Sequence, residues 1–236
     1  MHREYRKWFS PQLGREMEML IFGHAGLPTI VFPTSCGRFY DFEDHGMVAS
    51  VAHRIAGGHL RLYCVDSVDG ESWYNRGIHG VVKIARHNQY ERYILQEVVR
   101  LVRDRSRDMR LVAVGCSFGG YHAINIALRH PDIFTGCLSM SGSFEVGNFL
   151  RGHYDTESYF HVPLHYMANI NDPWYIERYR RNILVLATAE HDQCWNDNER
   201  LSAILRGKNI PHRLDVWSKP HGHDWPTWNR MVQVYL

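Results

Sequence analysis

The sequence predicts an α/β fold with a mostly parallel central sheet of about eight strands and helices on both faces. Short apolar runs typical of buried strands alternate with segments of helical spacing along most of the chain. The first two strand-like segments flank Gly14 closely, as the arms of a hairpin do. No repeat or change of composition divides the 236 residues, so we expect a single domain over 1–236.

The elements follow in chain order. Residues 3–10 and 15–23 alternate polar and apolar positions and predict two antiparallel strands at one edge of the sheet. Further strands are expected at 27–32, 59–65, 109–115, 133–140, 183–189 and 212–217. Helices are expected at about 41–56, 90–103, 118–130, 196–207 and 225–234. Because strands and helices alternate after the hairpin, these strands should run mostly parallel.

An aromatic-rich segment at about 142–181 fits neither pattern. We interpret it as a small cap, whose rings would form a substrate wall, a subunit interface or ordinary core. The sequence does not rank these three roles.

Composition excludes several classes of partner. With a formal net charge of only +2, the chain gives no case for nucleic-acid or membrane binding. No apolar run approaches the roughly 18 residues that span a bilayer. The first seven residues are too charged for a signal peptide, so a complete gene product would be cytoplasmic. Five cysteines without a pairing motif agree with a reducing compartment. The sixteen histidines are mostly scattered, and no metal site is expected.

The most informative motif is Gly115-Cys116-Ser117-Phe118-Gly119, followed by Gly120. An apolar strand leads into it and an amphipathic helix leads out, which is the setting of the nucleophile elbow in α/β-hydrolases. Glycines relieve crowding where the strand and helix pass closely. The helix N-terminus directs free N–H groups toward charge that develops on a substrate. The motif predicts Ser117 as a nucleophile.

A serine nucleophile needs a base, and the base needs an orienting acid. In this fold the order along the chain is serine, acid, histidine, each following a strand. The strand at 183–189 leads into an acidic loop, and the last strand leads into a histidine-containing loop. The acid candidates are Glu190, Asp192 and Asp197, and the base candidates are His221 and His223. Asp224 is better placed to cap the last helix.

With these residues, the chain resembles the putative-esterase family of α/β-hydrolases, in its compact bacterial esterase branch. This family includes S-formylglutathione hydrolases, feruloyl esterases and mycolyltransferases. Three segments carry the resemblance: Ser117 to Tyr121, Ala189 to Asp192, and His223 to Trp225 with Trp228. The resemblance implies Asp192 as the acid and His223 as the base.

The loop after the third strand reads Pro33-Thr34-Ser35-Cys36-Gly37 and lacks the His-Gly-Gly of many lipases. Pro33 has no N–H, so Ser35 or Cys36 should supply the second oxyanion donor beside the Phe118 N–H. Trp73 and Tyr74 end the loop after the fourth strand, where they either line the substrate site or pack beneath the loop.

The sequence therefore predicts a carboxylic-ester hydrolase that acts through an acyl-enzyme on small esters, without metal or cofactor. Three rivals remain: an acyltransferase with the same triad, a catalytically silent binding protein on the same fold, and a metallohydrolase using the histidines. The oligomeric state is left open, a homo-oligomer included.

Overall fold

The computed structural model of the chain describes residues 1–106 and 108–236. Within them, eight strands form one sheet in the order β1-β2-β4-β3-β5-β6-β7-β8. Their bounds are β1 (Arg3–Ser10), β2 (Arg15–Phe22), β3 (Leu27–Phe32), β4 (Leu60–Val65), β5 (Val112–Cys116), β6 (Gly136–Met140), β7 (Ile183–Ala189) and β8 (Arg213–Trp217). Strands β1, β2 and β4 pair antiparallel, and every pairing from β4 through β3 to β8 is parallel. The predicted fold class is confirmed.

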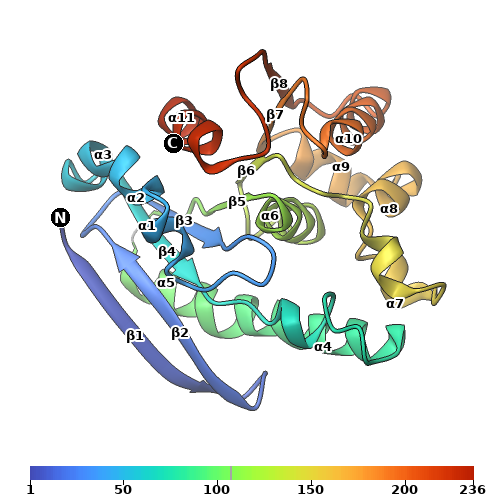
Figure 1. Cartoon of the computed structure of the whole chain (residues 1–236), viewed down its shortest axis with the longest axis horizontal. Coiled ribbons are helices and arrows are strands. Elements are labelled where there is room, and N and C mark those ends of the chain that lie inside the picture. The colour runs from blue at the N-terminus through green and yellow to red at the C-terminus, as the bar shows by residue number, and fades with distance from the viewer. Residues whose placement is uncertain (107) are drawn as a thin grey trace.

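Helices cover both faces of this sheet (Figure 1). On one face lie α1 (Asp41–Asp44), α2 (Met47–Ser50), α3 (Ala52–Ala56) and α11 (Trp225–Tyr235). The opposite face carries α4 (Gly80–Tyr93), α5 (Val99–Arg105), α6 (Phe118–Arg129), α8 (Pro163–Asn169) and α10 (Trp195–Gly207). Because successive side chains of a strand point to opposite faces, Tyr63 packs into one core while its neighbours Leu62 and Cys64 pack into the other. The central strands of the sheet are thus buried on both faces.

Two helical expectations need correction. The helix expected at 90–103 begins at Gly80 and continues through a π turn, η2 (Ile94–Val98), into α5. Its buried face carries polar residues such as Lys83, His87 and Glu91, which hide the apolar period. The helix expected at 41–56 is three short helices: Gly46, at a positive φ of 78°, separates the first two, and Val51, at φ −115°, separates the last two.

The aromatic segment folds into η3 (Val146–Leu150), α7 (Thr156–Tyr159), α8 and α9 (Pro173–Tyr179). Some of its rings belong to the core: Tyr166 and Tyr179 are buried, and the Tyr179 hydroxyl donates to the Leu128 carbonyl at 2.5 Å. Others, including Phe160 and Trp174, are exposed. The remaining short helix, η1 (Asp69–Glu71), follows β4.

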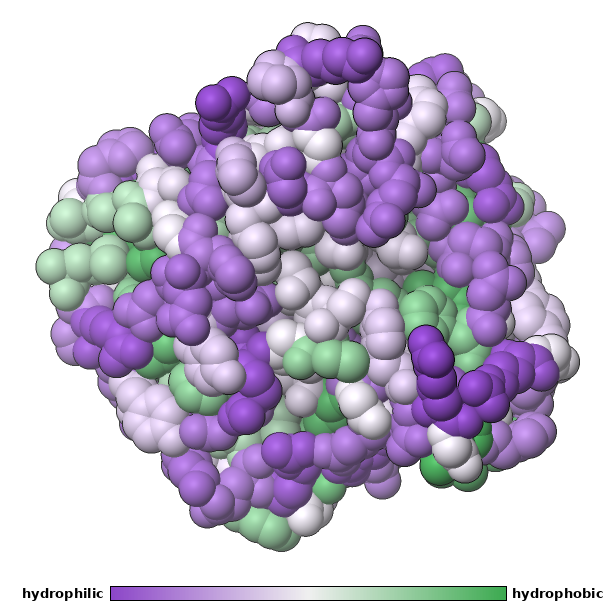
Figure 2. All heavy atoms as spheres, viewed as in Figure 1, coloured by the Kyte–Doolittle hydropathy of each residue, from purple (hydrophilic) through white to green (hydrophobic). Residues whose placement is uncertain are grey.

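The surface in the same view is mostly hydrophilic, and less polar side chains gather near its middle (Figure 2). In the part of the chain that the structure describes, no helix is both long and apolar enough to cross a bilayer.

Candidate active site

Ser117 lies in the turn between β5 and α6, with a strained backbone at φ 54° and ψ −120°. The glycines around it are required by close packing. A Cβ on Gly115 would lie 2.2 Å from the Gly119 carbonyl carbon, and a Cβ on Gly120 would lie 2.7 Å from the Ser139 hydroxyl oxygen. The sequence therefore makes a sharp turn here because three positions carry no side chain. This geometry presents a serine hydroxyl at the carboxyl end of a central strand.

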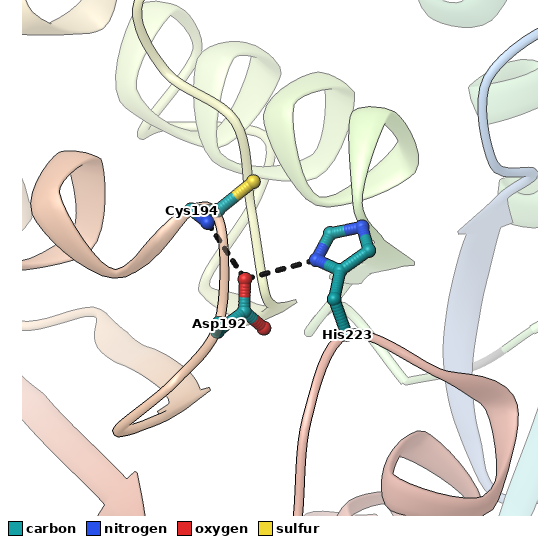
Figure 3. A group of neighbouring side chains, drawn as sticks. All are labelled: Asp192, Cys194 and His223. Carbon is teal, nitrogen blue, oxygen red and sulfur yellow. Dashed lines mark hydrogen bonds and ion pairs between the residues drawn. The ribbon is translucent and has the colours of Figure 1, made fainter.

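His223 joins Ser117 to Asp192. Its Nε2 lies 2.9 Å from the Ser117 Oγ, and its Nδ1 lies 2.9 Å from the Asp192 Oδ1. Figure 3 shows the His223 ring directed at the carboxylate, from loops that follow β7 and β8. Asp192 is buried, whereas the His223 side chain keeps 17% of its surface exposed. The His223 ring is thus partly accessible, whereas the Asp192 carboxylate that it contacts is shielded from solvent.

The pKa of Asp192 is lowered. Burial opposes ionisation, but the hydrogen bonds from His223 and from the Cys194 N–H, together with the nearby Ser141 hydroxyl, outweigh it. The Cys194 N–H donates to Oδ1 at 2.7 Å. These donors hold the carboxylate in its charged form, which favours the His223 tautomer with its proton on Nδ1.

The other candidate acids and the other candidate base lie elsewhere. Glu190 is exposed, and Asp197 accepts hydrogen bonds from two backbone N–H groups of the loop after β6. His221 uses Nδ1 on the Ser218 carbonyl and does not contact the serine. Asp224 caps α11 by accepting from the Thr227 N–H.

The candidate oxyanion donors lie on both sides of the elbow. Phe118 is the first residue of α6, so its N–H has no acceptor within the helix. The Cys36 N–H donates to the Asp69 Oδ2 at 3.3 Å, whereas no bond within 1–106 or 108–236 engages the Ser35 N–H. Ser35 is held by its hydroxyl, which lies 2.7 Å from the Tyr74 hydroxyl. The geometry favours Ser35 over Cys36 as the second donor.

Aromatic rings stand beside the elbow. Tyr74 is half-buried, and its ring centroid lies 5.0 Å from that of Phe118 and 4.8 Å from that of Phe149. Trp73 has no exposed surface and packs edge-on against Tyr121 behind this wall. Of the two residues considered for the substrate site, Tyr74 is accessible and Trp73 packs beneath the loop.

The model of one protein family, described as putative esterase, matches residues 66–233. The chain belongs to this putative esterase family. It is therefore a carboxylesterase-type hydrolase, as the residues around the elbow predicted. The matched range runs from the loop after β4 into α11 and includes the serine, the acid and the histidine described above.

Solved structures share the fold of this esterase at low sequence identity. A ferulic acid esterase superposes with a TM-score of 0.79 at 15% identity, over 100% of this chain and 96% of the other. An S-formylglutathione hydrolase from Agrobacterium tumefaciens gives 0.76 at 14% identity, over 99% and 92%. MPT51 of Mycobacterium tuberculosis gives 0.69 at 15% identity, over 98% and 96%. No curated protein matches the chain in sequence.

One group of side chains in the described residues has the proximity that a metal ion needs: Asp192, Cys194 and His223, with ligand atoms within 4.8 Å of one another. The chemistry of these three groups favours hydrogen bonds among them over binding of a metal ion. The His223 Nδ1 is shared with Asp192, and burial together with the nearby carboxylates raises the pKa of Cys194 to about 12. A thiol binds metal as its thiolate, so this one is a poor ligand at neutral pH.

Two features of the site of this esterase carry no signal in the sequence. Ser141, at a positive φ of 54°, accepts from the Trp228 indole at 2.9 Å and supports Asp192. Asp69 and His122 form a buried pair beneath the elbow. The sequence gives no sign of the pair, because a single histidine on a helix has no partner that spacing can reveal.

Proposed function

We propose that this esterase hydrolyses carboxylic esters of small acyl groups through an acyl-enzyme on Ser117, with His223 as general base and acid and Asp192 as the orienting carboxylate. The observation that carries the proposal is the pair of 2.9 Å contacts that His223 makes with Ser117 and Asp192. Each contact falls within the range required for proton transfer and for orientation of the ring.

The chemistry follows from these contacts. His223 Nε2 takes the Ser117 proton while Oγ adds to the ester carbonyl carbon. The imidazolium that forms is stabilised by Asp192, which stays ionised. His223 then gives the proton to the leaving alcohol, and the C–O bond to that alcohol breaks. In the second half, His223 takes a proton from water, the hydroxide adds to the acyl carbon, and Ser117 leaves with the returned proton.

The negative oxygen of each tetrahedral intermediate needs two donors. We assign them to the backbone N–H groups of Phe118 and Ser35. Cys36 is excluded because its N–H already serves the Asp69 carboxylate, whose charge would repel an oxyanion at that place. Loss of one such donor typically costs about 3–4 kcal/mol in the barrier.

Small acyl groups are favoured by the aromatic wall beside Ser117. Tyr74 and Phe149 stand together, and Tyr74 is tied to the oxyanion loop through Ser35. The proposal places the activity in the cytoplasm, because all five cysteines are unpaired in the described structure, as a reducing compartment favours.

The test is hydrolysis of a p-nitrophenyl ester series from acetate to decanoate by wild type and Ser117→Ala. Turnover should fall with acyl length and vanish in the variant, and a fluorophosphonate probe should label wild type alone. Ser202 is a matched control, since its hydroxyl also contacts a histidine, His212, at 2.7 Å. It lies within α10 and not at a sharp strand-to-helix turn. Ser202→Ala should keep kcat and labelling. Full activity in Ser117→Ala would sink the proposal.

A further inference from the structure

A buried carboxylate–histidine pair links the elbow helix to the oxyanion loop. Asp69, at the start of η1, and His122, in α6, are 1% and 3% exposed. The Asp69 Oδ1 lies 2.9 Å from the His122 Nε2, and its Oδ2 accepts from the Cys36 N–H at 3.3 Å. One carboxylate thus contacts both segments that carry the assigned oxyanion donors.

We propose that Asp69 and His122 are positioning residues, which hold the loop of Ser35 and Cys36 against α6 so that two N–H groups converge on one oxyanion. This inference rests on the proposed ester hydrolysis. Neither side chain touches the reacting atoms, and neither takes or gives a proton in the mechanism above.

The His122 ring has the right place for this role. It stacks on Phe32 at a centroid distance of 5.8 Å and meets Phe118 edge-on at 5.1 Å. Phe32 ends β3 directly before the oxyanion loop, and Phe118 carries the other donor. The His122 ring therefore packs between Phe32, which precedes the oxyanion loop, and Phe118, which begins α6. In this position the ring sets the distance between the two segments that carry the donors.

The loop itself needs to be held. Cys36 adopts a positive φ of 54°, which costs a non-glycine residue about 1 kcal/mol or more. The hydrogen bond from its N–H to Asp69 fixes this turn, and it leaves the N–H of the preceding Ser35 for the substrate. Thr34 is fixed separately, since its N–H and hydroxyl both donate to Asp41.

Stability alone does not explain why Asp69 and His122 are buried together. Taking two hydrogen-bonded polar side chains out of water costs most of what their contact returns, and apolar replacements of similar shape are often as stable. Precise placement of backbone donors is a benefit that an apolar pair would not supply, because only the carboxylate accepts from the Cys36 N–H.

The experiment compares kcat and KM for p-nitrophenyl acetate in wild type, Asp69→Asn and His122→Phe. An asparagine side chain has one oxygen acceptor, so the His122 N–H and the Cys36 N–H can no longer both donate to separate carboxylate oxygens. We expect kcat to fall tenfold to about a hundredfold, the loss that a displacement near 1 Å causes, with KM within twofold. The double variant should be no slower than about the slower single variant, since both changes break one linkage.

A second measurement distinguishes a loss of donor positioning from a general loss of folded structure. Phenylboronic acid adds to an active-site serine as a tetrahedral anion, so its affinity reports the oxyanion geometry. Its inhibition constant should rise in parallel with the loss of kcat. His122→Gln keeps an N–H donor for Asp69 and should regain most of kcat. If His122→Phe does not fold, the kcat of Asp69→Asn decides the matter.

Glu91, in α4, offers a matched control because it contacts residues at the C-terminal end of α6. Its carboxylate is also buried and contacts a histidine, His130, together with Arg129. Glu91→Gln should lower the melting temperature without changing kcat or boronate affinity at temperatures where it is folded. Unchanged kcat in folded Asp69→Asn or in folded His122→Phe, or an equal loss in Glu91→Gln, would overturn the inference. Activity that survives Ser117→Ala would instead overturn the proposed function.

Discussion

Replacing Gly119 by alanine places a methyl carbon where two backbone oxygens already stand. The added Cβ would lie 2.5 Å from the carbonyl oxygens of both Phe32 and Pro33, at the end of β3. Ordinary van der Waals contact begins at 3.4 Å, so the first turn of α6 and the end of β3 must separate by about 0.9 Å. Backbone cannot swing aside as a flexible side chain does.

This separation moves the Phe118 N–H away from the Ser35 N–H. A misplacement of about 1 Å at a catalytic centre can cost about a hundredfold in rate, or roughly 2.7 kcal/mol in the barrier. Overpacking of this kind typically also costs about 1–3 kcal/mol in the free energy of unfolding. We expect both losses in Gly119→Ala, with kcat measured on p-nitrophenyl acetate and stability measured by urea unfolding.

Gly207 provides the comparison. It ends α10, also within a helix, but a Cβ there would meet no atom within 4 Å. Gly207→Ala should leave kcat unchanged and stabilise the protein by up to about 1 kcal/mol, because alanine loses less backbone entropy in a helix. If Gly119→Ala kept kcat within twofold of wild type, the close approach of elbow and oxyanion loop would not set the donor geometry.

Two further predictions concern ionisable groups. Asp192→Asn should lower kcat at neutral pH by about 10⁴-fold, because an amide no longer selects the required histidine tautomer, whereas Glu190→Gln should stay within twofold; equal losses would misassign the acid. Burial and the Arg129 guanidinium lower the pKa of His161 to about 3, against the opposing charge of Glu91. The folded protein then keeps His161 neutral while the unfolded chain binds a proton below about pH 6.5, so stability should fall with decreasing pH by up to about 1.4 kcal/mol per unit. Urea unfolding at pH 7, 5 and 4 should show a shallower decline in His161→Gln, and an unchanged slope would contradict this cause.

Much of the fold could be predicted because it is written in local patterns. Alternation and apolar runs marked all eight strands, since the period of a strand follows from its pleat. The elbow was equally legible, because Gly115, Gly119 and Gly120 record a steric demand at fixed positions around Ser117. The start of α4 at Gly80 was missed, since buried polar residues such as Lys83 and His87 carry no apolar period.

The sequence by itself determined the class of chemistry: a serine on a sharp strand-to-helix turn, with acidic and histidine loops following in order. Only the tertiary structure decided which atoms meet. It brings His223 to Ser117 across 106 positions of the chain, and it joins Asp69 to both His122 and Cys36. The physical reason is that steric and periodic constraints act between near neighbours, whereas hydrogen bonds between loops depend on how the whole sheet aligns the ends of its strands.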